Sequence, residues 1–442
     1  MATSSRKTAL AALNAVTQNE GYSNIVIDKA IRAAGLAPRD AALASAIFYG
    51  VLEKRLTLDD AIGHFLAKPK QKMDETVRNI LRIAAYQMLY LDRIPDSAAV
   101  NEAVLCAAAY MNGRYKGFVN GVLRSFSRGR DALPPPESES VRWNIPQAVI
   151  DLWRRDYGAA LTEKLLAAMS TRAETYIRVN TLKTTAEALC RTLPEGTAAP
   201  AVESALSLHG AGDPTALPGF AKGLFHVQDL SSQLLCALVD PQPGERVVDV
   251  CAAPGGKSFT LAERMQNRGA LDAFDLYKGR VNLIRRGAER LGLSVVSAAV
   301  RDAADGPCEK QYDRVLCDVP CSGLGVIRRK PEIRYKNPES FAGLPALQLQ
   351  ILKHSAALVR PGGLLFYSTC TLHRAENAAV VEAFLQSNPA FEPYALPLSG
   401  ISRSVPDEPA HMLTMMPMNF GGDGFFAAGL RRREAPAAER TG

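Results

Sequence analysis

The chain has 442 residues, 47% hydrophobic and 22% charged, a composition typical of a globular protein with enough apolar material for several cores. No uninterrupted apolar run is long enough to span a membrane, and the first residues lead into an amphipathic segment unlike a secretory signal peptide. These features exclude membrane-spanning and disordered classes, and a cytoplasmic protein of about two or three domains is expected.

The net charge of +7 is concentrated at the start of the chain. Residues 1–130 contain 18 Lys and Arg against 11 Asp and Glu, whereas the remaining 312 residues contain 34 of each. An excess of positive charge in one region suggests a polyanionic partner, most simply nucleic acid. The alternative is a solvated basic surface without a partner.

The cysteines show neither a metal-site pattern nor a disulfide framework. They form no CxxC pair and have no histidine at zinc-site spacing, so no metal is expected. Most are expected to be reduced and buried in the core. The set comprises Cys106, Cys190, Cys236, Cys251, Cys308, Cys317, Cys321 and Cys370.

Residues 5–130 have a helical pattern throughout and predict an all-α bundle, taken as a domain over residues 1–130. The clearest helix is predicted over residues 76–90, where apolar side chains recur every three or four positions. The stripe consists of Val77, Ile80, Leu81, Ala84, Ala85, Met88 and Leu89.

The composition changes at residues 131–142, where three prolines and an acidic, serine-rich run predict a linker that does not pack. Residues 143–235 then predict a mixed module, with a small α+β insert before the main domain. Its expected elements are helical sequence over 143–169, a strand over 176–183, a helix over 185–192 and a strand around 206–209.

From residue 244 onward, apolar strands alternate with helices, which predicts an α/β Rossmann-like domain over residues 236–433 and a flexible tail over 434–442. Such a parallel sheet is covered on both faces, and its ligands bind beyond the carboxyl ends of the strands. The expected strands are 246–250, 270–275, 295–300, 314–318 and 364–369, and the expected helices are 258–265, 278–291 and 345–359.

The first of these strands ends in a turn that is a candidate ligand cradle. Gly255 and Gly256 let the backbone approach a ligand closely, and the helix that follows offers free N–H groups. The alternative is a tight turn without a ligand. The turn has neither the G-x-G-x-x-G pattern of dinucleotide sites nor a phosphate-binding loop, because Ala252 stands where that loop has its first glycine.

Acidic residues follow the later strands. Asp275 lies 26 residues after Asp249 and is placed to hold the two hydroxyls of a ribose, and Asp302 and Asp318 follow the next two strands. Each aspartate by itself is equally compatible with a turn residue or a helix cap. A nucleoside with an amino-acid tail, such as S-adenosylmethionine, fits this series better than a dinucleotide.

Two cysteines, Cys321 and Cys370, lie at the ends of strands expected to be neighbours and suggest covalent catalysis by a thiolate. Lys257 on the first loop is the expected cationic neighbour. The only histidine in these loops is His373, so a Cys–His pair of the protease type is not expected. The alternative for each cysteine is a buried structural role.

Motifs at these strand ends resemble those of the RNA cytosine-5 methyltransferases of the NOL1/NOP2/Sun family. The N-terminal region is similar to the NusB antitermination fold, and this pairing is the architecture of the bacterial Sun-type (Fmu) members, which methylate a cytosine in small-subunit (16S) rRNA. The motifs are Asp249-Val-Cys-Ala-Ala-Pro-Gly-Gly-Lys257, Asp318-Val-Pro-Cys-Ser-Gly-Leu-Gly-Val-Ile-Arg-Arg-Lys-Pro-Glu332, Tyr367-Ser-Thr-Cys-Thr371, Asp423-Gly-Phe-Phe426, Phe225-His-Val-Gln-Asp-Leu-Ser-Ser-Gln233, Ala85-Tyr-Gln-Met-Leu-Tyr90, Ala99-Val-Asn-Glu-Ala103 and Lys116-Gly-Phe-Val-Asn-Gly-Val-Leu-Arg124.

The resemblance implies a class I methyltransferase domain, S-adenosyl-L-methionine as the methyl donor and a role for each site residue. Cys370 matches the nucleophile that adds to C6 of the base, and Cys321 matches the cysteine that assists product release. Asp318 matches an acid that faces the base, and Lys257 is expected to be a cation that faces the reaction. The implied cofactor-binding residues are Cys251, Ala252, Ala253, Pro254, Gly255, Gly256, Lys257, Asp275, Asp302 and Asp318.

The resemblance implies rRNA as the partner. The target cytosine must leave any base stack to present its C6, so a single strand or a hairpin loop is the expected substrate region. Arg328, Arg329 and Lys330 follow the Cys321 loop and are expected to hold RNA phosphates, the alternative being a solvated loop. A monomer is expected. Two other functions stay open: the same reaction on tRNA or large-subunit rRNA, and a non-catalytic RNA-binding or antitermination protein.

Overall fold

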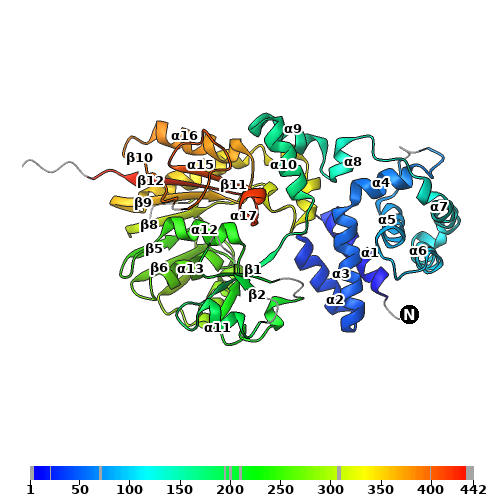
Figure 1. Cartoon of the computed structure of the whole chain (residues 1–442), viewed down its shortest axis with the longest axis horizontal. Coiled ribbons are helices and arrows are strands. Elements are labelled where there is room, and N and C mark those ends of the chain that lie inside the picture. The colour runs from blue at the N-terminus through cyan, green and yellow to red at the C-terminus, as the bar shows by residue number, and fades with distance from the viewer. Residues whose placement is uncertain are drawn as a thin grey trace, which may run out of the picture. The chain divides into compact units, whose positions relative to one another are not determined.

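The computed structural model describes residues 4–19, 21–68, 72–193, 196–198, 202–208, 212–305, 310–398 and 400–434. Cys308, the end of the predicted strand at position 209 and the predicted tail from residue 435 lie outside these ranges. The chain divides into two compact units. We call Met1–Leu152 with Ile327–Lys336 the helical unit, and Trp153–Val326 with Asn337–Gly442 the sheet unit (Figure 1).

The helical unit confirms the all-α prediction for the start of the chain. The predicted helix over 76–90 begins one residue earlier, because the carboxylate of Asp74 accepts hydrogen bonds from the backbone N–H groups of Thr76 and Val77. The helices are α1 (Ser5–Asn19), α2 (Ser23–Ala34), α3 (Pro38–Glu53), α4 (Arg55–Gly63), α5 (Glu75–Tyr90), α6 (Asp96–Ala109), α7 (Lys116–Gly129) and α8 (Glu139–Trp143).

The stretch predicted to be a non-packing linker is partly ordered. Its second half forms the start of α8, which begins where the Ser138 hydroxyl accepts a hydrogen bond from the Val141 N–H. The Thr57 hydroxyl in α4 donates to the Val141 carbonyl at 3.1 Å, and the Thr57 N–H donates to the side chain of Asn144. A serine followed by a glutamate is therefore the start of a helix here, and the expectation that this run does not pack was wrong for its second half.

A short segment of the chain's second half belongs to the helical unit. It contains the 3-10 helix η5 (Pro331–Tyr335). The Ser23 N–H donates to the carboxylate of Glu332 at 3.1 Å, and the Tyr335 hydroxyl donates to the Leu52 carbonyl at 2.9 Å. The guanidinium of Arg55 lies 4.8 Å from the centre of the Tyr335 ring.

The domain boundaries predicted from sequence remain predictions, because a compact unit can contain more than one domain.

The first part of the sheet unit is the predicted α+β insert. It contains a four-stranded antiparallel sheet in the order β2-β3-β1-β4. Its elements are α10 (Ala159–Met169), β1 (Thr175–Val179), α11 (Ala186–Cys190), β2 (Gly196–Ala198), β3 (Ala205–Leu208) and β4 (Phe225–Val227). The helical sequence predicted before it is divided between α9 (Gln147–Tyr157) and α10 at Gly158, whose φ of 78° interrupts the helix.

The main sheet has the strand order β10-β12-β9-β8-β5-β6-β7, with β11 pairing on β12. The five predicted strands pair in parallel, as expected, whereas the C-terminal strands are antiparallel and were not predicted. The strands are β5 (Arg246–Asp249), β6 (Ala270–Asp275), β7 (Val296–Val300), β8 (Tyr312–Asp318), β9 (Val359–Thr369), β10 (Phe391–Pro393), β11 (Met412–Met415) and β12 (Phe425–Arg432).

Helices cover both faces of this sheet (Figure 1). Val247 of β5 packs in the same cluster as residues of α12 (Leu230–Val239), α13 (Gly256–Arg264) and α14 (Lys278–Leu291). Val248, its neighbour, packs instead with residues of α15 (Leu344–Ala357) and α16 (Ala378–Ser387). Because successive side chains of a strand point to opposite faces, the centre of a strand buried on both faces must be apolar at consecutive positions, as Val247 and Val248 of β5 are.

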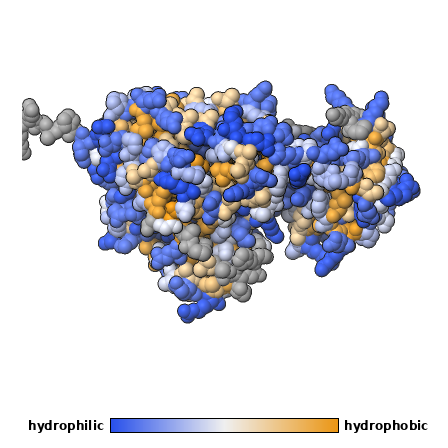
Figure 2. All heavy atoms as spheres, turned by 45° about the horizontal axis from the view of Figure 1, so that its top comes forward, coloured by the Kyte–Doolittle hydropathy of each residue, from blue (hydrophilic) through white to orange (hydrophobic). Residues whose placement is uncertain are grey.

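In the residues that the structure describes, no helix is both long enough and apolar enough to cross a membrane. Figure 2 shows hydrophilic and hydrophobic side chains interspersed over the face that it presents.

We expect Arg82→Met to destabilise the helical unit by about 3 kcal/mol, because Arg82 is buried and the change removes the shortest ion pairs of Asp59 and Glu75. Its guanidinium binds Asp59 through two contacts of 2.7 Å and Glu75 at 2.6 Å. Arg32→Met removes a pair whose side chains are 81% and 66% exposed and is expected to cost less than about 0.5 kcal/mol. Urea unfolding followed by circular dichroism measures both. Equal effects of the two changes would contradict the assigned role of Arg82.

Candidate active site

The turn after β5 brings backbone close to the start of α13. Gly255 adopts a φ of 111°, and a Cβ at this position would lie 2.4 Å from the Phe259 ring, so only glycine fits. Gly256, in contrast, has open space in front of it, since the nearest atom to an added Cβ is a side-chain carbon of Gln228 at 3.9 Å. The turn therefore leaves room at the N-terminus of α13, as the cradle prediction requires.

Asp249, the last residue of β5, is buried at the base of this turn. One carboxylate oxygen accepts a hydrogen bond from the Ser258 hydroxyl at 2.8 Å, and the other has no partner among the described residues. Burial raises the pKa of Asp249 to about 7, and the nearby charge of Asp318 adds to the effect of burial. A buried carboxylate oxygen without a partner is suited to bind a cationic group of a ligand.

Asp275 and Asp302, which are both predicted to bind the cofactor, differ in their environments. Asp275 ends β6 and is buried, and its carboxylate accepts from the Tyr277 N–H at 3.1 Å and pairs with Arg280 at 3.5 Å. Asp302 is exposed and accepts from the Ala304 N–H at 2.8 Å. The contact of Asp302 is one that an ordinary turn residue makes, so its cofactor role remains a prediction.

Lys257 and Asp318 form an ion pair at the centre of the site. The Lys257 ammonium lies 2.7 Å from one carboxylate oxygen of Asp318 and 5.3 Å from the centre of the Phe425 ring. The other oxygen of Asp318 accepts from the Ser368 hydroxyl at 2.8 Å. Burial by itself lowers the pKa of Lys257, but the charge and hydrogen bond of Asp318 outweigh it, so its pKa lies above its usual value and the lysine is charged.

The two cysteines predicted to be catalytic lie side by side. Their sulfur atoms, on the loops after β8 and β9, are 3.3 Å apart. The pKa of the Cys321 thiol is well above its ordinary value because of its hydrogen bond with Cys370, its burial and the negative charges around it. The Cys321 thiol is therefore protonated at neutral pH, and its sulfur lies within hydrogen-bond distance of the sulfur of Cys370.

Backbone contacts join the two cysteine loops to a third loop. The Gly325 N–H donates to the Cys370 carbonyl at 3.0 Å, and the Gly424 N–H donates to the Gly325 carbonyl at 2.9 Å. A Cβ at Gly325 would lie 2.0 Å from the Gly424 carbonyl oxygen, so the contact requires glycine. The loop of Gly424 is tied in turn to the start of α12, because the carboxylate of Asp229 accepts from the Asp423 N–H at 3.0 Å.

Several site residues were missed by the sequence analysis. Ser368, which binds Asp318, and Phe425, whose ring lies beside the Lys257 ammonium, belong to the motifs given above, but no role was predicted for either. Glu376 is completely buried and binds the residue next to Cys321. A glutamate seven residues after a strand resembles a solvated helix start, so no local signal distinguishes it.

The residues predicted to bind RNA phosphates, Arg328, Arg329 and Lys330, lie in the segment of the helical unit described above. All three are half-buried, and the Lys330 ammonium lies 5.1 Å from the centre of the Tyr22 ring. They are not grouped with the cysteines in the sheet unit, and their RNA-binding role remains a prediction.

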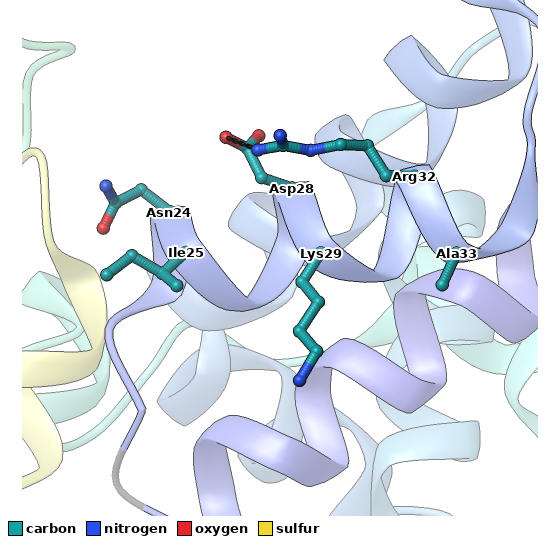
Figure 3. Close-up of a pocket in the computed structure, with 6 residues that line it drawn as sticks. All are labelled: Asn24, Ile25, Asp28, Lys29, Arg32 and Ala33. Atoms are coloured by element: carbon teal, nitrogen blue, oxygen red, sulfur yellow. Dashed lines mark ion pairs between the residues drawn. The ribbon is translucent and has the colours of Figure 1, made fainter. Parts of the chain in front are cut away.

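A separate hollow lies along α2 and contains none of the predicted site residues. Figure 3 shows its six labelled residues, Asn24, Ile25, Asp28, Lys29, Arg32 and Ala33, all from that helix. The charge of Arg32 is matched by Asp28, one turn before it on the same helix. A surface formed by one helix with a matched ion pair defines no ligand.

The residues after β5 and β6 fit a zwitterionic nucleoside. Free N–H groups at the start of α13 suit a carboxylate, the unpartnered oxygen of Asp249 suits an ammonium, and Asp275 suits ribose hydroxyls. Within the described ranges no group of three or more His, Cys, Asp or Glu is placed to hold a metal ion.

Comparisons with known proteins agree across the whole chain. Residues 236–431 match a family model described as 16S rRNA methyltransferase RsmB/F, residues 3–128 match the NusB family, and residues 145–214 match the ferredoxin-like domain of RsmF/B-like methyltransferases. The fold is similar to the crystal structure of PH0851, with 26% identity and a TM-score of 0.81 over 98% of this chain and 100% of that one.

Two related proteins match this chain over nearly their whole length. A probable ribosomal RNA small subunit methyltransferase B of Bacillus subtilis is 38% identical over 98% of this chain and 99% of its own length. The ribosomal RNA small subunit methyltransferase B of Salmonella arizonae is 33% identical over 95% of this chain and 96% of its own.

We expect the wild type to lose stability relative to Asp249→Asn as the pH rises. A carboxyl whose pKa is raised from 3.8 to about 7 by folding stabilises the protein below pH 4, and this contribution is lost as the pH passes 7. The free energy of unfolding of the wild type minus that of the variant should therefore fall between pH 4 and pH 7 and level off above it. Urea titrations at each pH measure it, with the exposed Asp302→Asn as control. A difference independent of pH would show that Asp249 is ionised throughout.

Proposed function

Because the chain belongs to the 16S rRNA methyltransferase RsmB/F family, we propose that it methylates C5 of a cytosine in small-subunit rRNA through a covalent adduct with Cys370. The relatives confirm the resemblance drawn from the motifs, including the NusB-like region. The observation that carries the finer proposal is the pair of sulfur atoms, 3.3 Å apart, on the loops that follow two neighbouring strands.

The protein uses S-adenosyl-L-methionine, which supplies an electrophilic methyl group when bound. We place it at the turn after β5, with Asp249, Asp275 and the N–H groups of Gly256 and Lys257 as the groups that would hold it. These residues bind and orient a ligand and take no part in bond making.

C5 of cytosine is a weak nucleophile and must be activated. The Cys370 thiolate adds to C6, forming an S–C6 bond and moving an electron pair onto C5. That pair forms the bond to the methyl group as the bond from the methyl group to the sulfonium sulfur breaks, with S-adenosylhomocysteine as the leaving group. A base removes the C5 proton, the electron pair returns to the ring, and the S–C6 bond breaks to release the thiolate. Asp318 is placed to stabilise charge that develops on the ring, with its own orientation held by Lys257 and Ser368.

The environments of the two thiols support Cys370 as the nucleophile. The raised pKa of Cys321 makes it the proton-bearing member of the pair at neutral pH, and a thiolate is the reactive form. After methyl transfer, Cys321 is 3.3 Å from the sulfur that must depart and can assist release. In the sequence, only the family resemblance ranks Cys370 before Cys321 as the nucleophile.

The substrate region is expected to be single-stranded or a hairpin loop, so that the target base can be turned toward the thiols. The excess positive charge of residues 1–130 and the basic group at Arg328, Arg329 and Lys330 supply contacts for phosphates. We propose a monomer that acts in the cytoplasm, where rRNA is assembled into subunits.

We expect Cys321→Ala to accumulate a covalent complex with small-subunit rRNA and Cys370→Ala to form none, because only the first retains the attacking thiolate. Denaturing gel electrophoresis with labelled RNA measures the complex, and Cys106→Ala, in the core of the helical unit, serves as the control. An adduct with Cys370→Ala and none with Cys321→Ala would reverse the two assignments.

We expect deletion of the gene to remove the C5 methyl group from one cytosine of 16S rRNA, because the family acts on that molecule. Bisulfite sequencing of total RNA detects this loss as a new cytosine-to-uracil conversion, and a plasmid copy of the wild type should reverse it. Loss of a methyl group from tRNA or large-subunit rRNA instead would move the substrate, and no change in any RNA would favour a non-catalytic RNA-binding protein.

A further inference from the structure

Glu376 is a fully buried carboxylate whose contacts the catalytic steps above do not use. It lies in the 3-10 helix η7 (Arg374–Glu376), six residues after Cys370, and its side chain is 0% exposed. Both of its carboxylate oxygens accept hydrogen bonds, and so does its backbone carbonyl, which binds the Tyr367 hydroxyl at 2.6 Å. A buried charge is costly unless its partners are specific, so these contacts need an explanation.

The contacts of Glu376 fix the loop of Cys321 on both sides of the cysteine. One carboxylate oxygen accepts from the Ser322 N–H at 2.9 Å, and the other accepts from the Ser322 hydroxyl at 2.5 Å. The Gln348 amide donates at 2.9 Å both to Glu376 and to the carbonyl of Pro320. The residues before and after Cys321 are thus held by one carboxylate and one amide.

The next residue, Asn377, fixes the loop of Cys370 in the same way. Its side-chain carbonyl accepts from the Thr369 hydroxyl at 2.6 Å, and its amide donates to the Thr371 carbonyl at 2.9 Å. The hydroxyls of Thr371 and Ser322 are 2.7 Å apart and join the two sets of contacts. Two consecutive residues therefore determine where the two sulfur atoms lie relative to each other.

The network requires a charged carboxylate. Burial by itself raises the pKa of Glu376, but the hydrogen bonds from His373, Ser322 and Gln348 outweigh it, so its pKa lies below the usual value. The Nδ1 atom of His373 lies 3.0 Å from one of its carboxylate oxygens. A carboxylate provides two acceptor oxygens for these donors, whereas a glutamine provides one acceptor and adds a donor.

We propose that Glu376 is a positioning residue that holds Cys321 against Cys370, so that the second thiol can complete the release step that follows methyl transfer. Asn377 has the corresponding role for the attacking thiol. The inference rests on the proposed function, since it concerns the order in which the two cysteines act.

Removing the contacts of Glu376 and removing those of Asn377 should have opposite effects on the covalent complex. Glu376→Gln disturbs the Cys321 loop and leaves the Asn377 contacts in place, so attack should continue while release slows. We expect multiple-turnover methylation of unmethylated small-subunit rRNA to fall about 10- to 100-fold, single-turnover methyl transfer to change less than about threefold, and the adduct to accumulate. Asn377→Ala should instead lower adduct formation and single-turnover transfer together.

The matched control is Glu408→Gln. Glu408 is buried in the same unit and accepts from the N–H and hydroxyl of Thr414, both at 2.6 Å, but it contacts neither cysteine loop. A residue that supports only folding would lower all rates in proportion to the folded fraction, as Glu408→Gln is expected to do. Gln348→Met, which removes one donor and keeps the side-chain volume, replaces Glu376→Gln if that variant does not fold, and the same criteria apply to it.

Cys321→Ala serves as the positive control for adduct accumulation and separates two kinds of failure. If Cys321→Ala accumulates adduct while a folded Glu376→Gln protein divides RNA between adduct and product as the wild type does, the positioning role is overturned and the proposed function stands. If Cys321→Ala also accumulates none, the covalent function itself fails.

Discussion

The candidate active site depends on the parallel pairing of β8 with β9. In this register Asp318 lies opposite Ser368, so the loops that follow the two strands leave the sheet at the same edge and next to each other. Each loop carries one cysteine a few residues later, which places the two sulfur atoms 3.3 Å apart. Because β5 pairs with the other side of β8, the glycine turn after β5 reaches the same edge.

Three carboxylates around this edge, two of them buried and that of Asp318 half-buried, are stabilised in different ways. Asp318 is neutralised by the ammonium of Lys257, Glu376 is kept charged by hydrogen-bond donors, and Asp249 has one donor and a pKa raised to about 7. These differences follow from the number of donors that each group meets. They also suit the three proposed roles: a fixed charge beside the base for Asp318, a fixed acceptor that holds loops for Glu376, and an oxygen available to a ligand for Asp249.

The two compact units share more than one passage of the chain. Besides the connection before Trp153, the chain enters the helical unit after Val326 and leaves it at Lys336. Within that unit the segment is held by buried side chains, among them Glu332, which binds the start of α2, and Arg334, whose guanidinium donates to the Asn144 carbonyl. The loop that carries Cys321 is therefore continuous in sequence with a segment of the helical unit's fold.

Hydrophobic periodicity and strand-end chemistry determined most of the fold and the main site residues. The apolar runs ending at Asp249, Asp275 and Asp318 are local patterns. Because ligands bind beyond the carboxyl ends of parallel strands, these three ends were predicted to form one site. Only the tertiary structure shows the features that depend on contacts between distant residues. These are the antiparallel pairing of β12 with β9, the packing of α8, the inclusion of residues 327–336 in the helical unit, and the hydrogen bonds of Glu376 and Asn377 to the two cysteine loops. A glutamate that meets donors from Ser322, 54 positions earlier, has no local signature, because its environment exists only once the loops have come together.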